Sequence, residues 1–394
     1  MRRNQRTRSD QPRYPMIRLA TTLAALSLLV VGAPVIPAQE RVTPAKSKGG
    51  KSLGEPWAGV PEELRRLKPP DWKLPDDLKR WQSADRAKTR DTVLKCLGEL
   101  PPRPKTLAVK VTATEDKGTY TLERFEFDNG VDSVVTGMLM IPKGQKGPLP
   151  AVIGLHGHGG SKETICTDEP NAQCVGPLLV KKGFVVAAID SYFCGDRSGK
   201  KVGDRQLSGA DEGTWVKLNL WLGRSLWGMM LRDQQCLIDH LVTRPEVDPK
   251  RIGVTGMSMG GTGTWWLAAI DDRVAAGVGV AGFTRYAELI AHNGVRLHGM
   301  YYFVPGLLRH FDTEAVYSLI APRPLLMLSG DRDFGLPLTG IEVLEKKLGA
   351  VYKLHGQSDH FRSVVYENTA HEYLPEMRDR MAAWFEKHLA GRDR

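Results

Sequence analysis

The most informative stretch of this chain reads Gly256-Met257-Ser258-Met259-Gly260. A strand-like apolar run, residues 251–255, precedes it, and a helix-like run, residues 262–270, follows it. This context is typical of the nucleophile elbow, a sharp turn that holds a serine hydroxyl out at the top of a sheet. The turn leaves no room for a Cβ beside the serine, which itself takes an unfavourable backbone conformation. The pattern predicts a nucleophilic Ser258, and a small-residue turn that only lets a helix pack closely is the alternative.

Short apolar runs bounded by turn residues recur on both sides of this stretch, and helical segments separate most of them. They are residues 151–155, 184–189, 252–255, 276–280 and 324–328. Continuous apolar strands that alternate with helices indicate a parallel sheet covered on both faces. Three earlier runs instead alternate apolar and polar side chains, as half-exposed antiparallel strands do. These are residues 107–114, 120–127 and 134–141. We therefore expect an α/β fold with a mostly parallel central sheet, antiparallel N-terminal strands and helices on both faces.

The N-terminal region reads as an export signal followed by a linker. In residues 1–38, basic residues precede the apolar run 19–31, and a cleavage site near Ile36-Pro37-Ala38 follows. Because that run is short for a membrane span, we expect cleavage, no stable membrane insertion afterwards and a periplasmic or secreted protein. An uncleaved signal anchor is the alternative. Residues 39–75 are rich in Lys, Gly and Pro and predict a flexible linker, which leaves residues 76–394 as the folded domain.

Charge and cysteine content exclude several classes of site. The formal net charge is +10, and residues 1–38, with six Arg and one Asp, supply half of it. The remaining basic residues form no block or stripe, so nucleic-acid binding is not expected. The five cysteines lack metal-ligand spacing, so no metal site is expected. In an exported protein a pair could oxidise, and Cys166 and Cys174 are nearest in sequence.

A glycine-rich loop after the first parallel strand is the expected oxyanion hole. It reads His156-Gly157-His158-Gly159-Gly160-Ser161. Glycines let the backbone approach a substrate, and exposed N–H groups can face a developing negative charge. We expect the backbone N–H groups of His158 and Met259 to form the hole. A flexible glycine turn is the alternative.

A serine nucleophile needs a base to accept its proton and a carboxylate to orient that base. The loop after the last apolar run offers Asp331 and Asp333, and residue order does not separate them. The base should follow the acid and lie just before the closing amphipathic helix, residues 372–389. His371 meets both conditions, and His360 is the rival. The order Ser, Asp, His is that of serine hydrolases with this sheet.

From about Leu107 to Leu389 the chain resembles bacterial α/β-hydrolases of the acetyl xylan esterase and dienelactone hydrolase-like group. Five segments carry the resemblance: 156–161, 190–192, 195–197, 244–261 and 329–333. The resemblance favours Asp333 as the acid, through the Gly-x-x-Asp spacing at the strand end, and it implies that Arg197 pairs with a carboxylate near the site. Dienelactone hydrolases proper use a cysteine nucleophile, whereas this chain has Ser258.

The resemblance implies an exported serine esterase that cleaves short-acyl carboxylic esters, including acetyl esters on carbohydrate, through an acyl-enzyme. The substrate would be a small-molecule or polysaccharide ester, and the chemistry needs no cofactor or metal. Residues 284–317 are rich in aromatics, and they predict either a lid or acyl-pocket wall, or a plain helix with a buried aromatic face.

Two other functions fit parts of this pattern. A serine peptidase of the prolyl oligopeptidase type shares the triad and the closing helix. Such peptidases carry a large propeller, and only about one hundred residues precede the sheet here, which is too few for one. The other alternative is a non-catalytic binding protein on a hydrolase scaffold, because fold alone does not establish chemistry.

Overall fold

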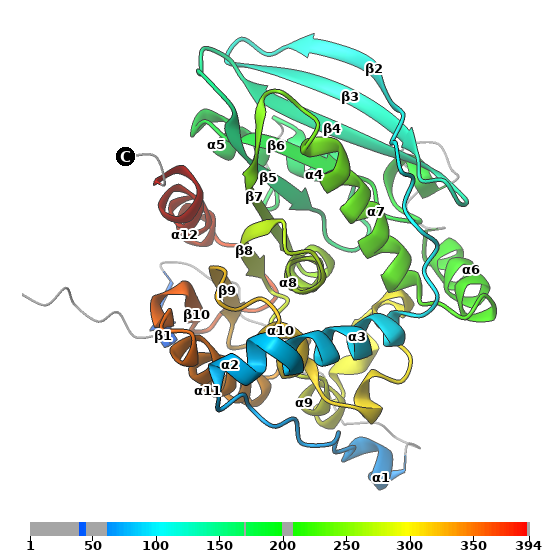
Figure 1. Cartoon of the computed structure of the whole chain (residues 1–394), viewed down its shortest axis with the longest axis vertical. Coiled ribbons are helices and arrows are strands. Elements are labelled where there is room, and N and C mark those ends of the chain that lie inside the picture. Colours follow the sequence, from blue (N-terminus) through cyan, green and yellow to red (C-terminus); the bar gives the residue numbers. More distant parts are fainter. Residues whose placement is uncertain (1–38, 45–60, 169–170, 199–207, 392–394) are drawn as a thin grey trace, which may run out of the picture. The chain divides into compact units, whose positions relative to one another are not determined.

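A mixed sheet runs through the part of the chain that the computed structural model describes, residues 39–44, 61–168, 171–198 and 208–391 (Figure 1). Within those residues it has ten strands, in the order β1-β10-β9-β8-β7-β5-β6-β4-β3-β2. The strands are β1 (Gln39–Val42), β2 (Val109–Asp116), β3 (Tyr120–Asp128), β4 (Val134–Pro142), β5 (Leu149–Leu155), β6 (Val185–Ile189), β7 (Val247–Met257), β8 (Val274–Val280), β9 (Leu325–Gly330) and β10 (Phe361–Tyr366).

The sheet divides into a parallel and an antiparallel part, as the hydrophobic patterns predict. The strands from β1 to β6 in sheet order pair in parallel, and β6, β4, β3 and β2 pair antiparallel. Each residue of β6 and β9 is buried, whereas burial alternates along β3. A strand covered on both faces needs apolar side chains throughout, and a strand with one solvated face does not. The predicted fold class is confirmed.

Two strands at one edge of the sheet lie outside the predicted set. β10 contains Arg362 and Ser363, which interrupt the apolar run that marks the other parallel strands. β1 pairs in parallel with β10, from Gln39 opposite Ser363 to Val42 opposite Tyr366. An edge strand presents unpaired backbone groups, which an extended segment of almost any composition can satisfy.

The strand β1 corrects part of the predicted linker. Residues 39–42 belong to the sheet, and two side chains fasten them: Arg41 bonds Glu345 at 3.0 Å, and Glu40 accepts from Arg380 at 2.6 Å. Composition alone favoured a linker because it carries no information on partners that lie about 300 residues away in sequence. The predicted signal at residues 1–38 lies outside the described residues, as do residues 45–60 of the predicted linker.

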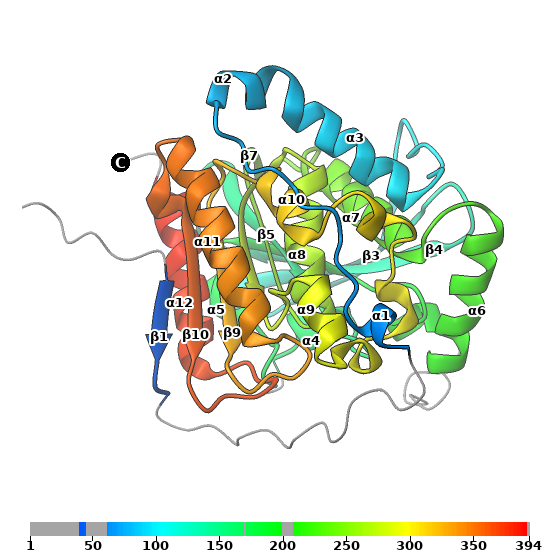
Figure 2. The same ribbon diagram turned by 90° about the horizontal axis from the view of Figure 1, so that it is seen from below.

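Helices cover both faces of the sheet (Figures 1 and 2). One face carries α7, α8, α10 and α11, and the other carries α4, α5 and α12. The helices are α1 (Glu62–Arg65), α2 (Leu78–Arg80), α3 (Arg86–Leu97), α4 (Lys162–Cys166), α5 (Gly176–Lys181), α6 (Ser208–Trp221), α7 (Leu226–Leu241), α8 (Met259–Ile270), α9 (Tyr286–Ala291), α10 (Thr313–Ser318), α11 (Leu338–Leu354) and α12 (Pro375–Phe385). The two π-helical turns are η1 (Trp81–Asp85) and η8 (Glu386–Ala390).

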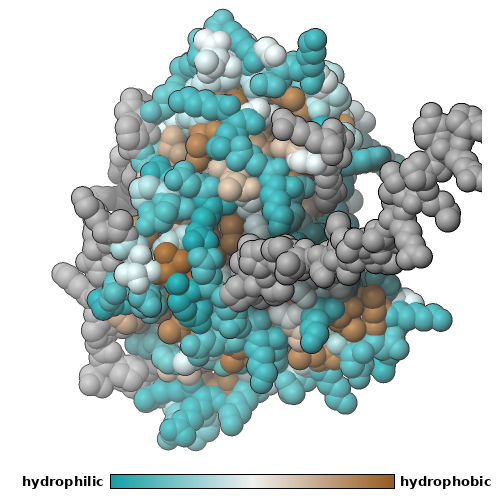
Figure 3. Space-filling view, turned by 90° about the vertical axis from the view of Figure 1, so that its left-hand side faces the viewer, coloured by the Kyte–Doolittle hydropathy of each residue, from teal (hydrophilic) through white to brown (hydrophobic). Residues whose placement is uncertain are grey.

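Helix α8 forms the centre of the core, since every one of its residues is buried. The face that bears α12 and β1 is largely hydrophilic and shows only small, separate apolar areas (Figure 3). No helix among the described residues is long and apolar enough to cross a bilayer. All five cysteines, Cys166 and Cys174 included, are free thiols in the structure.

Candidate active site

The loops that hold the predicted site residues meet at one edge of the sheet. Ser258 directly follows β7, His158 lies three residues after β5, Asp333 three after β9 and His371 five after β10. In sheet order these strands are β10, β9, β8, β7 and β5, and all pair in parallel. The carboxyl ends of parallel strands share one edge, which is where open α/β sheets place their ligands.

Ser258 has the strained backbone that the Gly-x-Ser-x-Gly pattern predicts. Its φ is 61° and its ψ is −118°, a left-handed conformation that serine adopts only under constraint. The backbone N–H of Ser258 donates to Val280 at 2.9 Å, which anchors the turn to β8. A Cβ at Gly256 or Gly260 would collide with the carbonyl oxygen of Leu155. Both positions must therefore be glycine, because β5 approaches so closely. The half-buried serine lies at the N-terminus of α8.

His371 and Asp333 are in direct contact. Nδ1 of His371 lies 2.6 Å from Oδ2 of Asp333, whose other oxygen accepts the Gly335 N–H at 3.1 Å. Because the carboxylate accepts, Nδ1 carries the proton, and Nε2 is left as the basic nitrogen. The Asp333 side chain is 3% exposed and the His371 side chain is 48% exposed. Burial alone would lower the pKa of His371, but the hydrogen bond and charge of Asp333 outweigh burial and raise it.

The structure does not join Ser258 to His371 by a hydrogen bond among the described residues. Such contacts are often long before a substrate binds and tighten only in the reacting complex. The structure does provide a serine at the end of β7 and, three strands further along the same edge, an imidazole that a carboxylate orients.

The two alternative site residues lie elsewhere. Oδ1 of Asp331 accepts the backbone N–H of Thr369 at 3.2 Å and so braces the loop after β10. His360 precedes β10, at the amino edge of the sheet, where its Nδ1 lies 2.8 Å from the carbonyl of Pro322. His360 is therefore on the opposite edge from Ser258, a distinction that depends on β10, the strand that the hydrophobic pattern does not reveal.

His156 holds the predicted oxyanion loop from behind. The Ser191 N–H donates to its Nε2 at 3.1 Å, so Nδ1 carries the proton and donates to the Gly157 carbonyl at 2.8 Å. Burial lowers the pKa of His156 and keeps the ring neutral. The Gly160 N–H donates to the same carbonyl at 2.9 Å. The Gly157 carbonyl and the His158 N–H belong to the same trans peptide and therefore point in opposite directions. The two hydrogen bonds to the Gly157 carbonyl thus also fix the direction of the His158 N–H.

The two predicted oxyanion donors are available. Neither the backbone N–H of His158 nor that of Met259 donates to any residue in the described ranges. Met259 is the first residue of α8, where N–H groups have no partner within the helix. Both donors follow strands that are neighbours in the sheet, β5 and β7.

A buried carboxylate that sequence reasoning missed fixes the His158 side chain. Oε2 of Glu212, on α6, lies 2.8 Å from Nε2 of His158, and its Oε1 accepts the Tyr301 N–H at 2.9 Å. Burial raises the pKa of Glu212, but the bonds from His158 and the backbone outweigh it, so the net shift is downward. A Cβ at Gly299 would press on the same carboxylate. No local pattern marks Glu212, because it lies 54 residues beyond His158.

The aromatic-rich insertion at residues 284–317 touches the site from two sides. It contains α9, the short turns η4 (Gly294–Leu297), η5 (Met300–Tyr302) and η6 (Leu307–Arg309), and all but the last residue of α10. The Tyr301 ring lies 5.2 Å from that of His158, and Nε2 of His298 lies 3.2 Å from the carbonyl of Gly335. The insertion thus contacts both the loop after β5 and the loop after β9, and its side chains Tyr286, Tyr301 and Tyr302 are buried.

Buried ion pairs fix the loop after β6. Lys162 donates to Asp190 and Asp196, each at 2.7 Å, and Arg197 pairs with Asp233 at 2.9 Å and donates to the Asp190 carbonyl. Buried charges stabilise a fold when hydrogen bonds satisfy them. Lys162 donates one to each of its two carboxylates, whereas Oδ2 of Asp233 has the ion pair with Arg197 but no hydrogen bond. Arg197 therefore has the carboxylate partner implied by the resemblance, and the group acts as a scaffold for the Ser191 N–H.

Comparison with known proteins places this architecture in one family. The Abhydrolase family model matches residues 57–392. The chain is 35% identical over 285 residues to Putative hydrolase YtaP of Bacillus subtilis, which covers 71% of this chain and 92% of that one. A glucuronoyl esterase from Solibacter usitatus matches with a TM-score of 0.61 at 16% identity, over 82% of this chain and 99% of that one. A putative acetyl xylan esterase from Bacteroides fragilis matches with a TM-score of 0.62 at 20% identity, over 77% and 80%. With its sheet, strained serine and His–Asp pair, the chain belongs to the Abhydrolase family and has the α/β-hydrolase fold.

Proposed function

We propose that this protein is an exported serine esterase that uses Ser258, His371 and Asp333. Two features at the same edge of the sheet carry the proposal. One is a strained serine at the start of α8, and the other is an imidazole that a buried carboxylate orients. Strained backbone at a half-buried serine is costly and is kept where it serves chemistry.

In the proposed reaction His371 Nε2 accepts the Ser258 proton as the serine oxygen attacks the ester carbonyl. Asp333 keeps the proton on Nδ1 and stabilises the imidazolium that forms. His371 then gives its proton to the departing alcohol, which leaves an acyl-enzyme. Water, activated by the same imidazole, attacks the acyl-enzyme and releases the acid. The N–H groups of His158 and Met259 stabilise the oxyanion in both steps, and the chain's own residues suffice for each proton transfer.

The proposed substrate is a short-acyl ester, with acetyl esters on carbohydrate as the first class to test. The names of the structural relatives, acetyl xylan esterase and glucuronoyl esterase, support a small-molecule or polysaccharide ester. Export to the periplasm or beyond is supported by the basic and apolar composition of residues 1–38.

A fluorophosphonate probe tests the nucleophile directly. We expect one adduct, on the peptide that contains Ser258, with no label in the Ser258→Ala variant. Label on another residue would overturn the assignment of the nucleophile.

Paired substrates separate the competing functions. We expect turnover of p-nitrophenyl acetate and none of an aminoacyl nitroanilide. Preference for the anilide would indicate a serine peptidase, and turnover of neither substrate would favour a binding protein on the same scaffold.

A further inference from the structure

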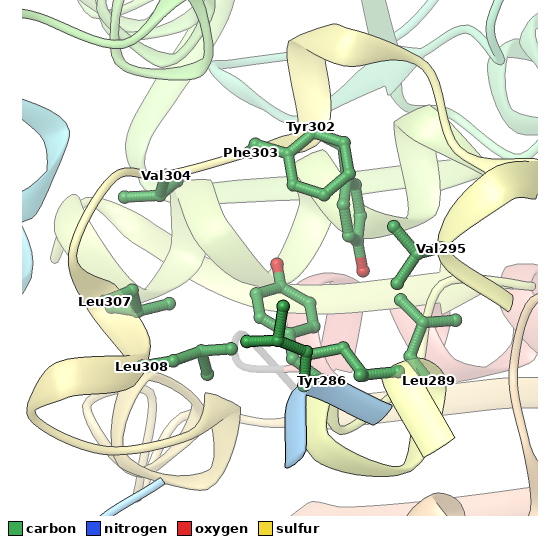
Figure 4. A pocket seen from close by; sticks show the side chains of 10 residues that line it. Tyr286, Leu289, Val295, Tyr302, Phe303, Val304, Leu307 and Leu308 are labelled. Carbon is green, nitrogen blue, oxygen red and sulfur yellow. The ribbon is translucent and has the colours of Figure 1, made fainter. Parts of the chain in front are cut away.

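Two of the segments that contact the loop at residues 156–161 are the insertion and residues 171–175, which precede α5. The insertion surrounds an apolar cavity of about 310 Å³, lined by Leu64 of α1 and by side chains between residues 286 and 308 (Figure 4). It reaches the loop at a side chain, since the Tyr301 ring lies 5.2 Å from that of His158. The segment before α5 instead reaches the backbone of the loop.

The side chain of Gln173 makes this backbone contact. The Gly157 N–H donates to Oε1 of Gln173 at 2.8 Å. Gly157 is buried, so its N–H cannot bond water freely and needs an acceptor inside the protein. A Cβ at Gly157 would lie 3.1 Å from both Oε1 and Nε2 of Gln173, so the amide group lies directly against the glycine. Among the residues that the structure describes, no other group accepts from this N–H.

Gly157 thus has a hydrogen-bonded peptide group on each side. The peptide that follows it includes the Gly157 carbonyl, which accepts from His156 and from the Gly160 N–H. The same peptide includes the N–H of His158, the predicted oxyanion donor. The peptide that precedes Gly157 includes its N–H, which Gln173 binds. Glycine rotates more freely than other residues about its two backbone torsions, so both peptides must be held to fix the direction of the His158 N–H.

Gln173 belongs to a segment that is itself anchored. Its backbone N–H donates to the side chain of Asn171 at 2.9 Å, and the Cys174 N–H donates to the Asn171 carbonyl at 3.2 Å. The Cys174 thiol donates to the Thr167 carbonyl at 2.8 Å, and Val175 is 2% exposed. The base of the Gln173 side chain is therefore fixed, which an acceptor needs if it is to hold another segment in place.

We propose that Gln173 is a positioning residue for oxyanion stabilisation, and that it acts by holding Gly157 so that the His158 N–H faces the reacting carbonyl. The effect on rate rests on the esterase function proposed above, whereas the contact itself does not. Without the acceptor, the buried Gly157 N–H would be left unsatisfied, and the loop would turn to satisfy it. The proposal gives Gln173 no contact with the ester, so its loss should affect turnover rather than substrate binding.

Steady-state kinetics of the full chain test the role in turnover. Gln173→Leu removes the acceptor and nearly keeps the size of the side chain. For p-nitrophenyl acetate we expect kcat to fall about tenfold, less than the 10²–10³-fold cost of removing an oxyanion donor outright, and KM to change less than about twofold. Gln145→Leu makes the same change at an exposed glutamine between β4 and β5, and it should leave both constants within about twofold. An unchanged kcat in Gln173→Leu would overturn the proposal.

A thionoester distinguishes a misdirected oxyanion donor from general damage to the fold. In p-nitrophenyl thionoacetate, sulfur replaces the carbonyl oxygen, and sulfur is a weak hydrogen-bond acceptor that gains little from the donors. Gln173→Leu should therefore slow the thionoester less than about twofold while it slows the oxygen ester about tenfold. Equal losses on the two esters would show that Gln173 does not act through the oxyanion donors, and the proposal would fail.

Amide hydrogen exchange tests the contact without any turnover. By NMR on the isotope-labelled full chain, the Gly157 N–H should exchange at least about tenfold faster in Gln173→Leu, whereas Gln173→Glu keeps an acceptor oxygen and should keep the protection. Unchanged exchange in folded Gln173→Leu would refute the contact.

A second variant serves if Gln173→Leu does not fold. Gly157→Ala pushes the amide group aside from the opposite partner, so it should give the same selective loss on the oxygen ester. Equal losses on both esters in this variant would again overturn the proposal. If the unaltered protein cleaves neither ester, the esterase proposal fails, and the exchange measurement still decides whether Gln173 holds Gly157.

Discussion

Two histidine–carboxylate pairs stand at the same edge of the sheet, and they differ in what holds them. In the first pair, His371 lies 2.6 Å from Asp333, and both follow adjacent parallel strands. In the second pair, His158 lies 2.8 Å from Glu212, which comes from helix α6. Each imidazole is nearly half exposed and each carboxylate is buried.

The second oxygen of each carboxylate shows the difference most clearly. In Asp333 this oxygen accepts from the N–H of Gly335 in the same loop, so that loop alone fixes the orientation of the carboxylate. In Glu212 it accepts from Tyr301 of the insertion, so the oxyanion loop, α6 and the insertion depend on one another. Sheet topology is sufficient to build the first pair, whereas the second requires three separate segments to dock. We infer that the first pair serves the proton transfer and that the second fixes the wall of the site.

The largest expected effect is loss of the first pair's base. His371→Ala should lower kcat for p-nitrophenyl acetate by about 10⁵-fold or more, since a serine without its base is a poor nucleophile. His360→Ala is the matched control, and it should stay within about twofold because His360 lies at the amino edge. Equal loss in both variants would mean that the effect is structural.

The next effect concerns the acid of the same pair. Asp333→Asn should lower kcat by about 10⁴-fold, because an amide in place of the carboxylate favours the wrong imidazole tautomer. Asp331→Asn is the control and should cost less than about tenfold, since Asp331 braces the backbone of Thr369. A reversed order of the two losses would transfer the catalytic role to Asp331.

A smaller effect is expected from the second pair. Glu212→Gln should lower kcat/KM by about tenfold, because it replaces the charged partner of His158 while the backbone donors remain. Glu288→Gln removes a carboxylate of the same insertion that pairs with Arg285, and it should leave kcat/KM within about twofold. A loss in Glu212→Gln as large as that in Asp333→Asn would refute the division of roles between the pairs.

The smallest effect is on pH dependence. The pKa of His371 is raised by Asp333, and only the neutral ring accepts the serine proton. Activity should therefore fall as pH drops through that pKa, with the midpoint of the acid limb of kcat/KM above about 6.5. A pH–rate profile measures this midpoint, and a value at or below that of an ordinary histidine would contradict the orientation of the pair.

The sequence pattern was sufficient to predict those features that residues close together in the chain determine. The glycines around Ser258 are required by a collision with Leu155, and the alternation in β3 follows from one solvated face. Asp333 was expected from the loop after the last apolar run and from the spacing that the resemblance favours, and His371 from its place after the acid and before the closing helix. The structure places the two side chains in contact. These features depend on local geometry and on the chain's own order.

Only the tertiary structure decided the features whose partners are distant in sequence. β1 joins the sheet through β10, Glu212 meets His158 across 54 residues, and Tyr286 and Tyr302 share a cavity with Leu64. Each of these contacts depends on how separate segments dock rather than on composition or periodicity. The turn at Ser258 was therefore readable in five residues, while the contacts of the insertion exist only once it has packed against α1, α6 and the loop after β9.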